Sequence, residues 1–277
     1  MILNKKFFLI VFLTISLNAK DRIITLSPAI NEIIYALGIG NQVVGNTQYC
    51  LFPKETLSVP KVGGYFSTSL EKILALNPTI VIMQKNNHKL QLQLNRLHIK
   101  TKMIQIDTLD NIKKSILELG NLFKQKKSAQ KIVKSINNSL EAIKNIVSNK
   151  RILIVFGHNI SLSKNIFVAG QNLYFNQIII ESGNINALQS KRKGQPILNM
   201  ENIIATNPDI VILLAHSIEK RGLTRKQLID PWLKLPINAS KTGSIYIENK
   251  IYAGIPSDRI VLFLNDFKEI LKDYKKR

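Results

Sequence analysis

The chain has 277 residues, of which 45% are hydrophobic, and a formal net charge of +21. This length is ample for one large or two modest domains with buried cores, and because the sequence contains only one cysteine, Cys50, an intramolecular disulfide is excluded. Such a basic charge raises the question of a nucleic-acid partner, but the N-terminal segment argues against one.

The first 19 residues have the layout of a secretory signal peptide. Lys5 and Lys6 precede an apolar stretch, residues 7–17, and the small residue Ala19 follows it. The stretch is too short for an ordinary membrane span, and no cysteine follows it that could carry lipid. We therefore expect cleavage after Ala19 and a soluble periplasmic protein, with a retained anchor as the alternative.

Beyond the leader, strand patterns alternate with helical patterns. A helix should begin at Ser27-Pro28, where serine caps the first turn and proline needs no N–H partner, and it should stop at Gly38. Runs of β-branched residues indicate buried strands, one of them after an Asn-Pro helix stop. The expected strands are residues 22–26, 43–47, 80–83 and 103–106, and a further helix is expected at residues 69–76.

The middle of the chain lacks a strand pattern. From residue 110 to residue 148 apolar residues recur three and four apart, which predicts helices, and Gly120 with the lysine-rich residues 124–127 should separate two of them. We interpret the second helix as a connection between two lobes. The predicted organisation is a leader, a first lobe, an interlobe helix and a second lobe, at residues 1–19, 20–125, 126–150 and 151–277.

The last part of the chain again alternates strands with helices. Strands are expected at residues 151–156 and 245–247, helices at residues 171–182 and after Ser257-Asp258, and a polar loop at residues 189–198. Such alternation predicts an α/β fold in which each lobe has a central, mainly parallel sheet flanked by helices.

A duplicated segment supports the two-lobed interpretation. Residues 70–82 read LEKILALNPTIVI and residues 200–212 read MENIIATNPDIVI, with eight identities at a constant offset of 130. Each copy predicts a short helix, an Asn-Pro stop and a buried strand. A period this long suits two related lobes with a ligand cleft between them. The alternative is that Asn-Pro merely separates helices from strands.

The sequence contains no HExxH, CxxC, GxSxG or P-loop motif. Cys50 with a distant base such as His158 is the enzymatic alternative, but nothing near the cysteine supports it. We therefore predict that the protein is not an enzyme and has no intrinsic cofactor.

Ligands of parallel α/β sheets bind beyond the carboxyl ends of the strands, so residues that follow each strand are binding candidates. Aromatic rings in such loops can wall a pocket or can pack beneath the loops. The aromatic candidates are Tyr49, Tyr65, Phe66, Phe167, Tyr174 and Tyr252. His88, His158 and His216 also follow predicted strands and are weak candidates for direct metal binding, because their spacing matches no metal-site signature.

Glu71 and Glu201 occupy the same position in the two copies of the repeat and lie off the apolar face of each helix. Thr68 and Glu71 fit a capping box, which Leu198 does not reproduce in the second copy. One accessible carboxylate on each lobe suits a partner that is itself two-fold symmetric.

Together these features resemble the periplasmic substrate-binding proteins of ABC importers for cobalamin, iron-siderophores and haem. The segments that carry the resemblance are RIITLSPAINEIIYALG (22–38), VVGNTQYCLFP (43–53), PKVGGYFSTSLEKILALNPTIVI (60–82), FGHN (156–159) and MENIIATNPDIVI (200–212). The resemblance implies two α/β lobes joined by one rigid interlobe helix and a ligand in a shallow cleft. It also implies that Glu71 and Glu201 dock on arginines of the two permease subunits.

The resemblance places Pro28, Tyr49 and Tyr65 in the cleft, with Tyr65 and Gln195 where cobalamin-binding members have tryptophan. Arg259, near the start of the last helix, is a candidate for meeting an anionic ligand, with helix packing as the alternative role. The predicted ligand-binding residues are Pro28, Tyr49, Tyr65, Phe66, His158, Phe167, Tyr252 and Arg259.

The predicted function is capture of a metal chelate, either iron-siderophore, haem or cobalamin, by a monomer that delivers it to an ABC permease dimer in the inner membrane. Two alternatives stay open. One is direct metal-ion binding by the histidines, and the other is a basic, non-catalytic surface-interaction protein that binds anionic polymer or lipid.

Overall fold

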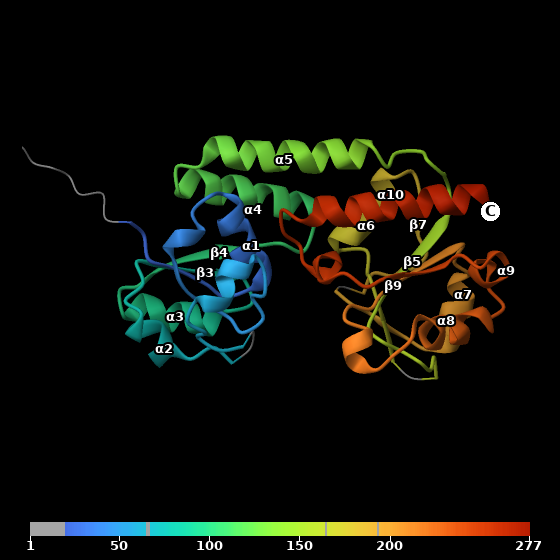
Figure 1. Ribbon diagram of the computed structural model, residues 1–277, viewed down its shortest axis with the longest axis horizontal. Helices are drawn as coiled ribbons and strands as arrows, with labels where there is room; N and C mark the ends of the chain where they lie inside the picture. The colour runs from blue at the N-terminus through green and yellow to red at the C-terminus, as the bar shows by residue number, and fades with distance from the viewer. Residues whose placement is uncertain (1–19, 65–66, 164, 193) are drawn as a thin grey trace, which may run out of the picture.

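The computed structural model describes residues 20–64, 67–163, 165–192 and 194–277, so the predicted signal peptide, Tyr65 and Phe66 lie outside the described residues. Two α/β lobes lie side by side, and helices α4 (Leu109–Leu122), α5 (Lys126–Glu141) and α10 (Ile260–Lys276) run along one side of the pair (Figure 1). Among the described residues, no helix combines the length and the apolar character that a membrane crossing requires.

The described part of the first lobe contains a four-stranded parallel sheet. Its strands, in spatial order, are β2 (Val43–Asn46), β1 (Ile23–Thr25), β3 (Ile80–Gln84) and β4 (Lys100–Ile104). Both faces of the sheet are buried: Ile82 of β3 packs in one apolar cluster, whereas Val81 and Met83 pack in another on the opposite face. Burial of both faces explains why these strands read as continuous apolar runs.

The helices of the first lobe begin at capping residues. Ser27 Oγ accepts a hydrogen bond from the Ile30 N–H at the start of α1 (Pro28–Ala36), and Gly38 lies just beyond its end with φ +85°, as predicted. The other helices of this lobe are α2 (Leu70–Ala75), α3 (His88–Arg96) and the short 3₁₀ helices η1 (Gly40–Gln42) and η2 (Lys54–Ser58).

The sequence does not predict α3. Its leucines, Leu90, Leu92 and Leu94, alternate with polar residues in the manner of a strand. Leu94 is fully buried and Leu90 packs against the same cluster, which is helical spacing. Leu92 between them is 59% exposed, and this exposed leucine makes the segment resemble an alternating strand.

The second lobe has a mixed sheet, whose described strands are β10 (Ile245–Glu248), β9 (Ile210–Leu214), β5 (Arg151–Phe156), β6 (Ile166–Val168) and β8 (Ile197–Leu198), with β7 (Ile185–Asn186) beside β5. The pairs β10–β9, β5–β9 and β5–β7 are parallel, whereas β6 is antiparallel to β5 and β8. The short strand β8 lies at the end of the segment predicted to be a loop.

The described helices of the second lobe are α6 (Tyr174–Glu181), α7 (Met200–Thr206), α8 (Arg225–Leu233) and α9 (Asn238–Thr242), with the 3₁₀ helices η3 (Glu219–Arg221) and η4 (Ile251–Gly254). Trp232 of α8 is completely buried in an apolar cluster that lies within this lobe.

The connection between the lobes is a pair of packed helices. α5 begins at Lys126, where predicted, but ends at Glu141, nine residues before the predicted end at residue 150. Gly120 does not break the preceding helix, because α4 continues to Leu122; a Cβ atom at Gly120 would collide with the side chain of Ala129 on α5. The glycine therefore permits the close approach of α4 to α5.

One apolar cluster extends across both lobes. It contains Ile30 of α1 and Ile112 of α4 from the first part of the chain, Ile136 of α5, and Phe175 of α6 and Phe263 of α10 from the second. The two lobes are therefore held by a common core rather than by a flexible linker.

The two copies of the repeat have the same local structure. Each helix is capped one residue later than expected: Ser69 Oγ accepts from Lys72 N–H, and Asn199 Oδ1 accepts from Asn202 N–H. The predicted capping role of Thr68 is therefore wrong, and the apparent mismatch at Leu198 disappears because the caps themselves are equivalent. Asn77 and Asn207 both adopt the left-handed conformation that ends each helix, with φ values of 42° and 40°.

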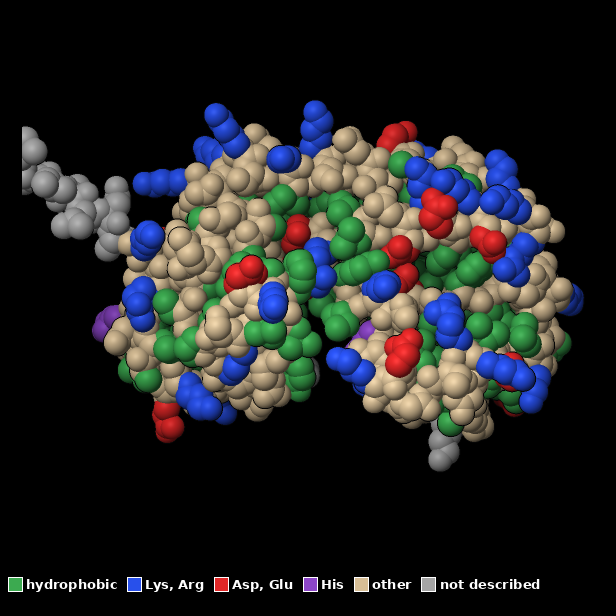
Figure 2. Space-filling model, in the orientation of Figure 1, with side chains coloured by type: hydrophobic (Ala, Val, Ile, Leu, Met, Phe, Trp, Pro, Cys, Tyr) green, Lys and Arg blue, Asp and Glu red, His purple; other side chains and the backbone are tan. Residues whose placement is uncertain are grey.

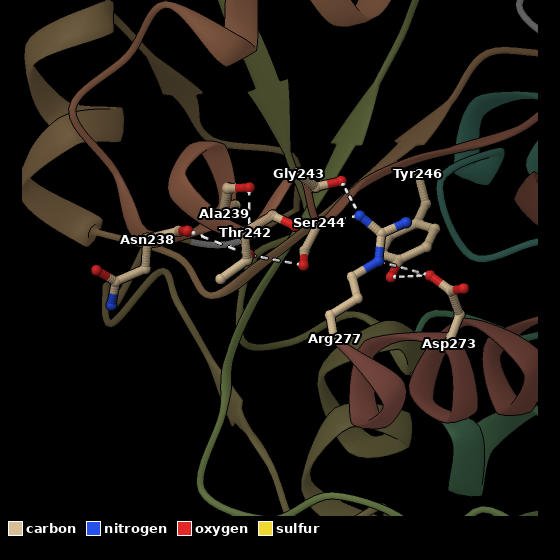
Figure 3. Close-up of polar contacts among 8 residues, drawn as sticks. All are labelled: Asn238, Ala239, Thr242, Gly243, Ser244, Tyr246, Asp273 and Arg277. Atoms are coloured by element: carbon tan, nitrogen blue, oxygen red, sulfur yellow. Dashed lines mark hydrogen bonds and ion pairs between the residues drawn. The ribbon is translucent and has the colours of Figure 1, made fainter.

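The last residue of the chain fastens α10 to the second lobe (Figure 3). Arg277 donates to the Asp273 carboxylate at 2.9 Å and to the carbonyl oxygens of Thr242 and Gly243 at 3.1 and 2.7 Å. Asp273 also accepts a hydrogen bond from the Tyr246 hydroxyl, which together with Arg277 lowers the pKa of Asp273. Arg277 thus satisfies carbonyl groups at the end of α9.

Replacing Gly120 should test the α4–α5 contact. Gly120→Leu forces a side chain into the space occupied by Ala129, and we expect the free energy of unfolding to fall by about 2 kcal/mol in urea titrations. Asn121→Leu places the same side chain at an exposed position of the same helix and should change stability little. Equal stability of the two variants would contradict the close contact.

Candidate ligand-binding cleft

A cavity of about 500 Å³ lies between the two lobes, and the surface is visibly notched between them on the side away from α5 (Figure 2). Residues 84–86 and 104–107 form the wall from the first lobe, and Phe156, residues 173–175, Gln195, Gly254 and Pro256 form the wall from the second. Its volume is within the range of ordinary small-molecule sites.

The position of the cavity follows from the sheet topology. Residues 84–86 come at the end of β3, residues 104–107 at the end of β4, and Phe156 at the end of β5. Because the carboxyl ends of parallel strands share one edge of a sheet, these residues face the space between the lobes.

A chain of polar contacts lines the first-lobe wall. Lys85 Nζ donates to Gln105 Oε1 at 2.8 Å, and Gln105 Nε2 donates to the Asp107 carboxylate at 3.0 Å. Asn111 donates to the other oxygen of Asp107 at 2.8 Å. Burial alone would raise the pKa of Asp107, but the hydrogen bonds from Gln105, Asn111 and the backbone outweigh it and lower the pKa.

The second-lobe wall is largely apolar. The rings of Phe156 and Phe175 meet edge to face, with centroids 5.7 Å apart. Tyr174 is buried beside them and donates its hydroxyl hydrogen to the Ala253 carbonyl at 3.1 Å; burial raises the pKa of this phenol. The Tyr174 hydroxyl is therefore committed to the protein rather than offered to a ligand.

A buried ion pair joins the lobes outside the cavity. Arg259, at the start of α10, donates from Nε to Glu32 of α1 at 3.1 Å and from a terminal nitrogen to the second carboxylate oxygen. The side chains are only 13% and 2% exposed. Ser257 donates to the same carboxylate, and the guanidinium lies 3.9 Å from the ring centre of Phe52.

Asp258 lies next to this ion pair, but unlike Glu32 it has no cationic partner among the described residues. Its Oδ1 is buried without a hydrogen-bond partner among the described residues. Burial, and then the nearby Glu32 carboxylate, raise the pKa of Asp258 to about 7.

The two repeat helices present their acidic residues to solvent. Glu71 and Glu201 are both exposed in the first turn of α2 and α7, and neither forms an ion pair with a described residue. Ile73 and Ile203, two residues further on, are fully buried beneath them. The repeat therefore places one unpaired carboxylate at the same point on each lobe.

Comparison with known proteins agrees with this arrangement. The family model described as "Periplasmic binding protein" matches residues 23–247. The chain belongs to the periplasmic binding protein family. Members of this family are substrate-binding proteins for transport and not enzymes.

Among its relatives, the vitamin B12-binding protein of Salmonella typhimurium is 27% identical over 234 residues, covering 83% of this chain and 85% of that protein. An uncharacterised ABC transporter substrate-binding lipoprotein of Bacillus subtilis is 28% identical, with coverage of 81% and 71%. The fold is shared with the periplasmic heme-binding protein of Vibrio cholerae, with a TM-score of 0.77 at 22% identity over 91% of this chain and 99% of that chain.

In this periplasmic binding protein two of the candidate positions, Tyr174 and Gln195, line the cavity, whereas the described residues predicted to contact ligand are not among its lining residues. Pro28 is the first residue of α1, and Tyr49, which follows β2, is 54% exposed. Phe167 is an exposed residue of β6, and Tyr252 donates its hydroxyl hydrogen to Asp266 at 2.6 Å. Tyr65 and Phe66 lie outside the described residues.

Arg259 takes part in helix packing, the second of its two predicted roles. Its guanidinium is bonded to Glu32 and stacked on Phe52, so it ties α10 to α1. The sequence does not identify the partner, because that residue lies 227 positions away.

The histidines do not converge. His158 and His216 meet edge to face with ring centroids 5.6 Å apart, and His158 Nε2 lies 2.6 Å from the His216 carbonyl oxygen. Burial, and then His158, lower the pKa of His216. His88 begins α3 in the other lobe, and the described residues contain no group of three potential ligands placed to hold a metal ion.

The environment of Cys50 does not suit the nucleophile of the enzymatic alternative. The Cys50 side chain is completely buried, its sulfur lies 3.3 Å from the Thr47 hydroxyl, and burial raises the pKa of the thiol.

Sequence reasoning missed Lys85, Gln105 and Asp107. The signal was available, because all three follow strand ends. The fourth strand was expected at residues 103–106 but occupies 100–104, so Gln105 and Ile106 were assigned to the strand instead of to the cavity. The lysines of β4, Lys100 and Lys102, obscured its start.

Removing the buried guanidinium should be costly. Arg259→Met leaves the Glu32 carboxylate buried without its cationic partner, and we expect the free energy of unfolding to fall by about 3 kcal/mol. The double variant Glu32→Gln, Arg259→Met should recover part of this loss in urea titrations, since no charge is then left unpaired. Lys144→Met, at an exposed ion pair with Glu141, is the control and should change stability little.

Asp258 should make stability depend on pH. Its pKa is higher in the folded chain, about 7, than in the unfolded chain, so the folded state binds more protons between about pH 4 and pH 7. The free energy of unfolding should therefore decrease as the pH rises through that window. Asp258→Asn should flatten this decrease in unfolding titrations measured at several pH values. An unchanged slope would contradict the assignment.

Proposed function

We propose that this protein binds a metal chelate whose own donor atoms fill the coordination shell of the metal, such as a corrinoid or a ferric siderophore. The observation that carries the proposal is the composition of the cavity wall. Its described residues combine apolar surface with side-chain amides and two charged groups, the Lys85 ammonium and the Asp107 carboxylate; the amides are those of Gln84, Asn86, Gln105 and Gln195.

These groups suit the periphery of a chelate rather than its metal. The described lining contains no histidine, cysteine or methionine, and the phenol of Tyr174 is bonded to Ala253. Haem iron is ordinarily held by an axial side chain of these types or by tyrosine. Amides, by contrast, donate to and accept from the amide, carbonyl and hydroxamate groups that surround corrinoids and siderophores.

The relatives support a cargo of this general class. Proteins named as vitamin B12-binding match the chain over most of its length, and proteins named as heme-binding share its fold. The common theme of these names is a metal held in a large organic chelate.

We further propose that residues 1–19 direct export and that the mature chain acts as a monomer in the periplasm. Its two lobes would meet the two subunits of an ABC permease through Glu71 and Glu201. The equivalent exposure of these residues, above the equivalent buried residues Ile73 and Ile203, supports this role. Matched carboxylates suit matched basic sites on a two-fold symmetric partner.

Ligand class can be tested by spectroscopic titration of the full mature protein with cyanocobalamin, ferrichrome, ferric dicitrate and hemin. We expect one-to-one binding of at least one of the first three, with the absorption spectrum of the bound chelate close to that of the free chelate. One-to-one binding of hemin with a shifted Soret band, and no binding of the others, would overturn the choice of chelate class.

Docking can be tested separately from binding. Glu71→Lys with Glu201→Lys should abolish uptake in cells while leaving the dissociation constant for ligand unchanged. The matched control reverses Glu141 and Glu269, exposed residues of α5 and α10, which run along the side of the molecule away from the cleft (Figure 1). Normal uptake by the variant with Glu71→Lys and Glu201→Lys would contradict the docking role.

A further inference from the structure

We propose that Lys85 is the residue that selects an anionic ligand in this cleft, by pairing with a carboxylate or phosphodiester group at the edge of the bound chelate. The inference rests on the proposed function and names the charge of its ligand. It starts from the two charged residues in the described lining, Lys85 and Asp107.

Asp107 uses its carboxylate oxygens within the wall of the first lobe. Both of its carboxylate oxygens accept hydrogen bonds from protein amides, one from Gln105 and one from Asn111. Its pKa is lowered by these bonds, so the carboxylate is stabilised by the protein itself. Because each oxygen already accepts a hydrogen bond from the protein, fewer acceptor sites remain for a ligand.

Lys85, in contrast, has hydrogen-bond donors available for a ligand. Its side chain is exposed, and its one contact recorded among the described residues is a hydrogen bond to the neutral Gln105 oxygen. No described carboxylate lies within ion-pair distance of its ammonium group. An ammonium group carries three hydrogens, so two remain for a ligand.

The Gln105 amide fixes the direction of that ammonium group. Its oxygen faces Lys85 because its nitrogen donates to Asp107, and Asp107 is held in turn by Asn111. The amide orientation is thus determined by the carboxylate behind it, and the lysine is held at the cavity wall without being neutralised. A preorganised charge costs less ordering on binding.

The charge of the whole chain acts in the same direction. The formal net charge is +21 for the full chain and +19 without Lys5 and Lys6 of the predicted leader, and a positive potential of this kind attracts anions at long range and raises their association rate. Lys85 converts this general attraction into a contact at the binding site.

The experiment uses two pairs of ligands, and in each pair only one member carries an anionic group. The first pair is cyanocobalamin, which carries a phosphodiester, and dicyanocobinamide, which lacks it. The second pair is ferric dicitrate, which carries carboxylates, and uncharged ferrichrome. The variant is Lys85→Gln, and the control is Lys89→Gln, which removes the same charge from an exposed residue of α3 that does not line the cavity.

We expect Lys85→Gln to weaken binding of the anionic member at least about tenfold and to reduce its salt dependence, with little effect on the uncharged member. Lys89→Gln should change neither. The pair that responds identifies the source of the anionic group. An equal effect of Lys85→Gln on both members, or no effect on a bound anionic member, overturns the proposal.

If no chelate binds the wild-type protein, the proposed function fails while the role of Lys85 can still be judged. Citrate alone is then titrated against isotope-labelled protein, with the Gln105 side-chain amide resonances as readout. A shift that Lys85→Gln abolishes and Lys89→Gln preserves supports an anion site at Lys85. The absence of any shift overturns it.

Discussion

The apolar core that extends across both lobes is the constraint on which the rest of the structure depends. α1, α4 and α5 pack with α6 and α10 in one cluster, so the two sheets are held in a fixed relation with their carboxyl edges facing each other. The cleft is the space left between those edges. Its walls need no closing motion to meet, because the backbone N–H of Tyr174 already donates to the Asp107 carbonyl at 2.7 Å across the junction.

Polar interactions add specific contacts to the arrangement of lobes that the core sets. The Glu32–Arg259 pair lies where the two lobes meet outside the cavity, buried and bidentate, and such a pair specifies one arrangement more than it adds stability. On the cavity wall, a second polar system orients an exposed lysine. One acid, Glu32, uses its charge to join the lobes, and another, Asp107, uses its charge to orient Gln105. The ammonium group of Lys85 is left facing the cavity.

The alternation of strands and helices could be predicted from the sequence because it depends on local patterns. The strand β5 occurs at the predicted residues, and Gly38 ends α1 as expected, since a buried strand and a left-handed helix end each have strong local signals. Local patterns do not predict the role of Gly120, because that role depends on contact with Ala129 in another helix. The cavity was missed for a related reason, because a shift of β4 by a few residues decides which side chains lie beyond the strand.

The single tryptophan has a practical consequence for anyone studying this molecule. Trp232 is enclosed by the core of the second lobe and is not among the residues that line the cleft. Its fluorescence will therefore report the unfolding of that lobe. A coloured cargo quenches tryptophan emission by energy transfer even without contact, so loading is better recorded through the absorption of the cargo and folding through the tryptophan of the empty protein.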